Sequence, residues 1–224
     1  MTTHISAKTL DFLRILSVNN NREWFNANKA QYVTAQTEVK AFAATLTDLM
    51  NQVDQIEKTK VYRIYRDVRF SKDKTPYKNS LSGFMVRATK WRRGGYYFHF
   101  EPDNSFMGAG FWNPNSPDLK RIRQEIAASP DELRTILADE NFKNYFGELQ
   151  GNKVKTAPKG YAKDHEAIDL LRYKQFLVRH PFTDKQVTSP NFVHELIKAY
   201  QAIRPFFNYM SDVLTTDENG VPIV

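Results

Sequence analysis

Residues 63–78 concentrate the side chains of this sequence that are best suited to binding an anion. The segment contains Arg63, Arg66, Arg69, Lys74, Tyr77 and Lys78, with Asp67 and Asp73 between them. Arginine grips phosphate or carboxylate with a planar, permanently charged fork, and tyrosine can donate a hydrogen bond to the same group. An aspartate among arginines can orient them or accept a proton. The string predicts a pocket for a small phosphorylated or carboxylated ligand, with Asp67 as a candidate acid or base.

The same residue types allow a purely structural interpretation. Arginines and aspartates in one segment can form an internal ion-pair lattice that only orders the chain around it. Asp73 is included among the ligand-binding candidates as part of the predicted concave basic site. The spacing of charges does not separate a ligand site from a lattice, so both interpretations stay open.

Two histidines are candidates for acid–base chemistry. His165 lies between Asp164 and Glu166, and it is the second candidate catalytic residue beside Asp67. Its alternative role is that of a polar residue at a helix N-terminus. His99 shares a predicted strand face with Tyr97 and Glu101, where it could act as a base or serve only as a hydrogen-bonded residue of the sheet.

The positive charge of the chain is concentrated around this segment. Of 224 residues, 32 are lysine or arginine and 25 are aspartate or glutamate, which gives a net charge of +7. The window 58–93 holds twelve bases and two acids, a net charge of +10, so the rest of the chain is mildly acidic. Such a localised charge favours an anion-binding surface over a uniformly basic protein.

Two further functions fit the basic window. Aromatic residues alternate with its bases, and stacking combined with backbone-tracking cations is how proteins hold single-stranded nucleic acid. A nucleic-acid-binding module is therefore an alternative, although no RRM or helix-turn-helix motif is present. An interaction domain for an acidic protein is the third alternative. Whether the protein is an enzyme stays open at this point.

Several classes of site are not expected. The chain has no cysteine, which excludes disulfides, thiolate metal sites and thiol nucleophiles. Its five histidines show no close pair with metal-ligand spacing, so we expect no metal site, and no motif names a cofactor. The N-terminus lacks a signal-peptide pattern and no segment is long and apolar enough to cross a membrane, so we expect a cytoplasmic protein without membrane contact.

Helical patterns flank the basic window on both sides. A short helix is expected after Ser6, and a long one up to about Asn51, because apolar residues recur there every three or four positions. Ser116, Ser129 and Ser189 each precede a proline, a sequence typical of a helix N-cap followed by its first turn.

The middle of the chain predicts strands. The two faces of residues 61–70 alternate as in a strand, and segments near 81–86, 96–101, 105–112 and 175–178 also suit strands. The close spacing leaves no room for crossover helices, so the strands should form an antiparallel meander. We predict an α+β fold with a long N-terminal helix and a sheet flanked by helices, in a single domain over 1–214 with a loose tail over 215–224.

The sequence also resembles a known family, an uncharacterised bacterial family with some fungal relatives that is catalogued as a domain of unknown function. The resemblance is carried by R-D-V-R-F-S-K-D-K-T-P-Y-K at 66–78, by N-N-R-E-W-F at 20–25 with Asn28, Lys29 and Tyr32, and by P-K-G-Y at 158–161 with Asp164, His165 and Lys174. It supports a single domain and implies no activity. If the three stretches converge, Arg22, Lys29, His165 and Lys174 would approach the basic site.

Overall fold

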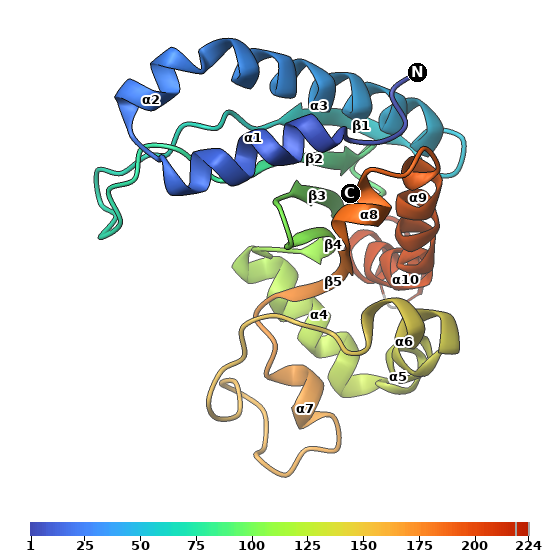
Figure 1. Cartoon of the computed structure of the whole chain (residues 1–224). Coiled ribbons are helices and arrows are strands. Elements are labelled where there is room, and N and C mark those ends of the chain that lie inside the picture. The colour runs from blue at the N-terminus through green and yellow to red at the C-terminus, as the bar shows by residue number, and fades with distance from the viewer. Residues whose placement is uncertain (218, 224) are drawn as a thin grey trace. The chain divides into compact units, whose positions relative to one another are not determined.

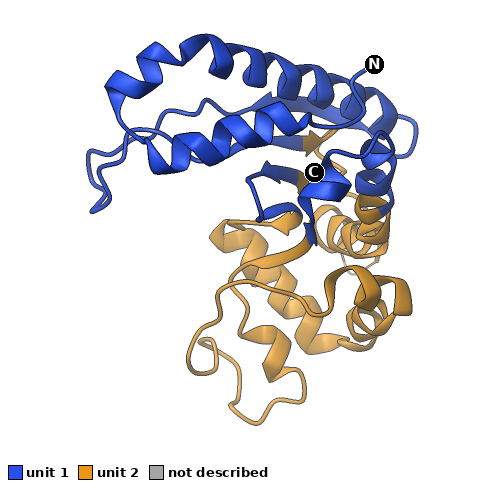
Figure 2. Cartoon of the chain, in the orientation of Figure 1, with its two compact units in different colours: residues 1–85, 97–107, 181–198 blue, residues 86–96, 108–180, 199–224 orange. Residues whose placement is uncertain are grey.

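The computed structural model describes residues 1–217 and 219–223. Clustering of the chain gives two compact units, shown in blue and orange in Figure 2. Unit 1 contains residues 1–85, 97–107 and 181–198, and unit 2 contains residues 86–96, 108–180 and 199–224. The prediction of one domain over 1–214 stays a prediction.

Helices and one sheet make up the chain, which confirms the α+β class (Figure 1). The helices are α1 (Ala7–Val18), α2 (Arg22–Ala27), α3 (Lys29–Met50), α4 (Ser116–Ala128), α5 (Asp131–Ala138), α6 (Glu140–Phe146), α7 (Ile168–Leu171), α8 (Asp184–Val187), α9 (Phe192–Ala202) and α10 (Arg204–Thr215). The strands are β1 (Ile56–Val61), β2 (Leu81–Arg87), β3 (Gly95–Phe100), β4 (Ser105–Phe111) and β5 (Phe176–Phe182). They lie in the order β1-β2-β3-β4-β5, as expected for an antiparallel meander.

The long N-terminal helix is present as α3, which packs against α1 in unit 1. A separate short helix, α2, precedes it, and Asn28 ends α2 and begins α3. The Trp24 carbonyl accepts from both the backbone amide and the side chain of Asn28, at 3.0 and 2.9 Å. Glu38 of α3 accepts from the amide and hydroxyl of Ser6, each at 3.0 Å, and thereby fixes the start of α1.

One face of the sheet forms the core of unit 1. On β3, Phe98 and Phe100 are fully buried and contact the ring of Phe42 from α3, at 6.3 and 5.3 Å between ring centroids. The alternate residues Tyr97 and His99 lie on the opposite face and are half-buried. A strand places successive side chains on opposite faces, so the packing of the two phenylalanines fixes the direction of the two polar rings.

The predicted strand over 61–70 is wrong beyond its first residue. The regular strand is β1, which ends at Val61. Beyond it the backbone makes scattered contacts, from Arg66 N to the Pro76 carbonyl at 2.9 Å and from Lys78 N to the Ile64 carbonyl at 2.8 Å. A polarity alternation becomes a strand only where a partner strand satisfies its backbone, and Pro76 has no amide hydrogen to donate.

The three Ser-Pro signals each locate a helix but misplace its start. Helix α4 begins at Ser116, and its N-cap is Asn115, whose side chain accepts from Asp118 N at 2.8 Å. Helix α5 has Pro130 at its N-cap position, and α9 begins at Phe192. An asparagine one position earlier can replace serine as the cap, because both side chains accept from the first turn of a helix.

Unit 2 has its own aromatic core, which includes Tyr96, Tyr200 and Phe207. Arg87 is 2% exposed in this core, and its guanidinium lies 4.9 Å from the Phe207 ring centroid and donates to the Arg93 carbonyl at 2.8 Å. The charge of Arg87 therefore belongs to the interior of unit 2 and does not contribute to an open basic surface.

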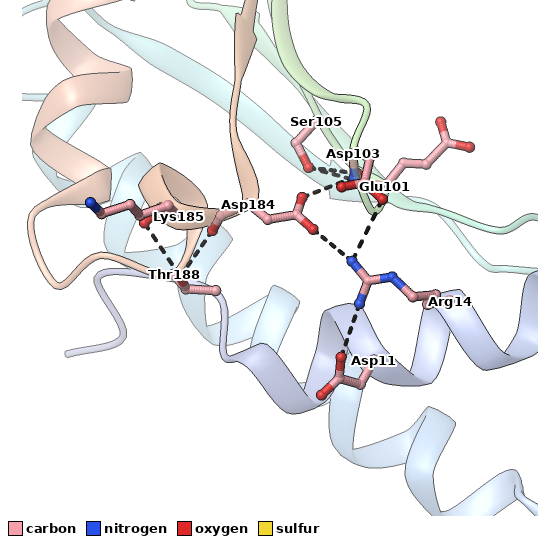
Figure 3. A network of polar contacts seen from close by, with 8 residues as sticks. All are labelled: Asp11, Arg14, Glu101, Asp103, Ser105, Asp184, Lys185 and Thr188. Atoms are coloured by element: carbon pink, nitrogen blue, oxygen red, sulfur yellow. Dashed lines mark hydrogen bonds and ion pairs between the residues drawn. The ribbon is translucent and has the colours of Figure 1, made fainter.

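A polar network ties together three segments of unit 1 (Figure 3). Arg14 on α1 forms ion pairs with Asp11 at 3.0 Å and with Asp184 on α8 at 2.9 Å. Asp184 also accepts from the backbone amide of Asp103, in the turn between β3 and β4, at 2.9 Å. This network fixes the turn that carries Glu101, whose carboxylate points away from Arg14 in Figure 3.

The end of the chain continues helix α10 through Thr215 and then forms a bridge between Thr216 and Pro222. Residues 218 and 224 of the predicted loose tail lie outside the described residues. Within residues 1–217 and 219–223, no helix combines the length and the apolar character that crossing a membrane requires.

Candidate functional site

The segment that carries the predicted site lies between β1 and β2 in unit 1, where Figure 1 shows it extending outward from the strands as a long loop. Tyr65 and Tyr77 form an isolated bridge across its base. The two sides of the loop therefore run antiparallel, and side chains from 62–66 face those from 76–78.

Arg66 is neutralised within the loop. Its guanidinium forms an ion pair with Asp73 and donates to the Thr75 hydroxyl. Asp73 also accepts from the Thr75 amide at 2.9 Å. The Thr75 amide and the Arg66 guanidinium lower the pKa of Asp73 from 3.8 to about 2. Of the two interpretations of the charged string, the ion-pair lattice describes this pair.

The Arg66–Asp73 pair predicts a local acid transition. Because the folded-state pKa of Asp73 lies below its unfolded value, the carboxylate stabilises the loop above pH 3.8, and this contribution is lost as the pH falls toward about 2. We expect the Asp73 side-chain carbon signal in NMR to titrate near pH 2. A midpoint near 3.8 would contradict the ion pair.

Asp67 and Arg69 form a second internal pair. Arg69 donates to both carboxylate oxygens of Asp67, at 2.9 and 2.6 Å, and these bonds lower the pKa of the exposed carboxyl. A depressed pKa holds Asp67 in its carboxylate form at neutral pH and makes it a weak base. Lys74 donates to the Val68 carbonyl at 3.0 Å, so its ammonium group is also engaged within the loop.

Tyr77 is a core residue of unit 1. Its ring is 5% exposed and stacks on Phe25 with 3.8 Å between centroids. The Asn20 side chain donates to the Tyr77 carbonyl at 2.8 Å and accepts from its amide at 3.1 Å, in the manner of a strand neighbour. Asn20 and Tyr77 line a polar pocket of about 180 Å³. The other lining residues are Ser17, Arg66, Asp73, Thr75 and Asn79.

Removal of the Asn20 side chain, which forms two hydrogen bonds with the Tyr77 backbone, should lower the stability of the protein. We expect Asn20→Ala to lower the free energy of unfolding by about 1–2 kcal/mol, because two backbone groups of Tyr77 lose their partner. The measurement is urea denaturation, with Asn26→Ala on the exposed side of α2 as the control. Equal stability of both variants would contradict this role for Asn20.

Two ammonium groups that are not part of this lattice lie beside one aromatic ring, and the Arg63 guanidinium acts electrostatically on one of them, Lys78. The ammonium groups of Lys60 and Lys78 lie 5.6 and 5.4 Å from the centroid of Tyr62, and Lys78 also donates to the Arg63 carbonyl at 3.3 Å. We call Lys60, Arg63 and Lys78 the cation cluster. Among the residues that the structure describes, no carboxylate forms an ion pair with any of the three.

Burial and like charge act together on Lys78. Desolvation of this half-buried ammonium lowers its pKa, and the neighbouring Arg63 guanidinium lowers it further. A nearby anion would stabilise the charged form of Lys78, because its negative charge offsets both the desolvation and the repulsion by Arg63. Arg63 and Lys78 were predicted from the sequence, but Lys60 and Tyr62 were not chosen, although the strand alternation through β1 was a signal for them.

The remaining predicted residues of unit 1 lie on the helices. Arg22 is the first residue of α2, and its charge is close enough to Tyr77 to act on the pKa of that phenol. Burial dominates, however, and raises the pKa of Tyr77. Lys29 is the first residue of α3 and is exposed.

A line of titratable side chains follows β3 on the face opposite the core. The Tyr97 hydroxyl lies 3.0 Å from His99 Nδ1, and His99 Nε2 lies 3.0 Å from Glu101 Oε2. Asn79 and Asn104 donate to the two oxygens of Glu101, at 2.5 and 2.7 Å. We call Tyr97, His99 and Glu101 the β3 triad. From the sequence, His99 was a possible base but not one of the two candidate catalytic residues.

The other predicted acid–base residue, His165, belongs to unit 2. Its Nδ1 accepts from the Ala167 amide at 3.1 Å, just before the start of α7, which is the helix-start role considered as its alternative. Lys174 is exposed in the same unit. A hollow of about 430 Å³ in unit 2 is lined in part by the ion pair of Arg134 with Asp169.

Exposed aromatic residues accompany the bases of the loop. Phe70 is 95% exposed, and the Arg69 guanidinium lies 6.0 Å from its ring centroid. Within the described part of the chain, no three histidine, aspartate or glutamate side chains come together in a way that could hold a metal ion.

Comparison with known proteins gives one family. No curated protein and no solved structure matched the chain. One family model matches residues 8–209, which include the loop, the cation cluster and the β3 triad. The chain therefore belongs to the family described as conserved hypothetical protein (DUF2461).

Proposed function

We propose that unit 1 binds a small phosphorylated or carboxylated molecule through the cation cluster. The observation that carries the proposal is the position of Lys78, which is half-buried next to Arg63 and lacks an ion-pair partner among the described residues. Most charges of the loop are paired locally, whereas the three cations of the cluster form no ion pair among the described residues, although Arg63 interacts electrostatically with the exposed Asp67. Such a cluster is consistent with a ligand that supplies the negative charge.

The surroundings of the cluster support a small ligand. The Tyr62 ring provides a flat apolar surface between Lys60 and Lys78, and its backbone amide is held by the Ser82 carbonyl at 2.8 Å. The pocket beside Asn20 and Tyr77 is too small for a whole metabolite, since ligand sites usually measure about 300–1,000 Å³. We assign it to the packing of the loop.

The test is an NMR titration of the full chain with inorganic phosphate, sulfate and succinate, read at the side-chain signals of Lys78 and Arg63. We expect saturable shifts and a rise in the pKa of Lys78 when the anion is bound, because a negative charge favours its ammonium form. A panel of sugar phosphates and nucleotides, compared by thermal shift, then identifies the preferred class. If none of the three anions moves the Lys78 signals at millimolar concentration, the proposal is wrong.

A second candidate function, single-stranded nucleic-acid binding, is favoured by Phe70. An aromatic ring that is 95% exposed and lies beside the Arg69 guanidinium presents a stacking surface next to positive charge. The test is fluorescence anisotropy with a labelled single-stranded oligonucleotide at several salt concentrations. Submicromolar binding that weakens steeply with salt and is lost in Phe70→Ala would support this function. Binding that Phe70→Ala leaves unchanged would exclude Phe70 as its contact.

A further inference from the structure

The β3 triad has the arrangement of a proton-transfer chain. A carboxylate can only accept hydrogen bonds, so His99 Nε2 must carry a proton to contact Glu101 at 3.0 Å. In the neutral imidazole, Nδ1 is then the acceptor for the Tyr97 hydroxyl at 3.0 Å. A carboxylate that fixes the tautomer of a histidine and stabilises its protonated form is a recurring element of acid–base sites.

The surrounding contacts hold this chain in place. Asn79 and Asn104 each donate to Glu101, so the carboxylate is fixed before any ligand binds. The His99 ring stacks on Phe106 of β4 with 4.6 Å between centroids. The side chains of His99 and Glu101 are 15% and 19% exposed, so both are shielded but not sealed from the solvent.

Ser82 connects the triad to the cation cluster. Its side chain hydrogen-bonds the Tyr97 phenol, and its carbonyl accepts from the backbone amide of Tyr62, whose ring lies beside Lys60 and Lys78. The Tyr62 phenol is also close enough to Tyr97 to interact with it electrostatically. The proton-transfer chain and the anion site are therefore adjacent within unit 1.

We propose that Tyr97 exchanges a proton with the bound ligand, that His99 accepts or returns this proton, and that Glu101 positions His99. The ligand class is a small phosphorylated or carboxylated molecule with a hydroxyl group near its anionic end. The ligand hydroxyl gives its proton to the Tyr97 oxygen while the Tyr97 proton moves to His99 Nδ1, which leaves a ligand alkoxide and an imidazolium paired with Glu101. This assignment rests on the proposed function of the cation cluster.

The test uses sulfate as the probe, because its charge stays constant over the range in which histidine titrates, from about pH 5 to about pH 8. The groups in contact with His99 include Tyr97 on its own strand, Glu101 just after that strand and the Phe106 ring from β4. Ser82 and Tyr62 act on the Tyr97 phenol. We expect sulfate to raise the titration midpoint of the His99 ring in NMR, because the added negative charge favours the imidazolium form.

If bound sulfate favours the protonated form of His99, protonation of His99 must in turn raise the affinity for sulfate. Sulfate should bind several-fold more tightly at about pH 6 than at about pH 8, and His99→Gln should remove this dependence while keeping the affinity measured at the higher pH. Glu101→Gln should lower the His99 midpoint by about one pH unit or more, which a merely structural role of Glu101 would not do. His194→Gln, elsewhere in unit 1, is the matched control and should change neither quantity.

The outcomes separate the two proposals. If sulfate binds but the His99 midpoint does not move and His99→Gln keeps the wild-type pH dependence, the proton-transfer assignment is wrong and the anion site stands. If sulfate does not bind, the proposed anion site is wrong and the assignment that rests on it is wrong as well. If Glu101→Gln leaves the His99 midpoint unchanged, Glu101 does not position His99 and the triad is wrong.

Discussion

Gly110→Ala is expected to lower the free energy of unfolding by about 3–5 kcal/mol, the largest effect on stability that we predict. Gly110 on β4 has a φ of +133°, a conformation that residues with a side chain rarely adopt. A Cβ at this position would lie 2.1 Å from the carbonyl oxygen of Phe176 and 2.9 Å from Leu177 Cα. Both of these atoms belong to the backbone of β5, which cannot move aside as a flexible side chain could.

The measurement for Gly110 is thermal or urea denaturation of the full chain. A loss of this size corresponds to a decrease in Tm of roughly 10–15 °C for a protein of this length. Gly160→Ala is the matched control, because Gly160 also has a positive φ, of +91°, but nothing lies within 4 Å of its Cβ position. The Gly160 variant therefore measures the cost of backbone strain alone, without the steric clash that Gly110→Ala adds. Equal losses in the two variants would contradict the close approach of β4 and β5.

Replacing both Arg63 and Lys78 by methionine is expected to weaken binding of phosphate or sulfate by roughly 10- to 100-fold. Each cation would contribute a charge-assisted hydrogen bond or a close ion pair to the anion, and one of them is half-buried next to Tyr62. Methionine keeps an unbranched apolar chain over the aromatic ring, so the variant removes charge and keeps most of the packing. The measurement is isothermal titration calorimetry at an ionic strength of about 0.15 M.

The control for the double variant is Lys8→Met with Lys40→Met. These lysines are exposed on α1 and α3 of the same unit, so the control removes the same net charge from a different surface. We expect it to change the affinity by less than about twofold, because separate surface charges are screened at ordinary ionic strength. If both double variants weaken binding equally, the effect comes from net charge alone and the cation cluster is not a site.

The sequence predicted a group of charged residues in the loop but not the contacts among them. Arg66, Asp67, Arg69 and Asp73 were selected because arginine and carboxylate types suit anion chemistry, but the structure pairs them with one another inside the loop. Residue type and spacing do not reveal which carboxylate lies within reach of which guanidinium, since loop conformation decides this. Arg63 and Lys78 were selected by the same argument, and the structure places them beside each other without such a partner among the described residues.

By itself, the sequence determined the α+β class, the antiparallel order of the strands and the general location of the helices that it predicted. These features depend on local patterns, namely a period near two or near 3.6 and turn residues between the segments. The face on which Tyr97, His99 and Glu101 lie was also readable, because alternation on a strand is strict.

Only the tertiary structure decided where β1 ends, why Gly110 must be glycine and which histidine lies between a phenol and a carboxylate. The end of β1 depends on the presence of a partner strand. The need for glycine at position 110 comes from the close approach of Phe176, which lies more than sixty residues away in the chain. His165 proved to hold the start of α7, whereas His99 has a phenol on one ring nitrogen and a carboxylate on the other. Proton transfer depends on such distances, and a single sequence contains no direct measure of them.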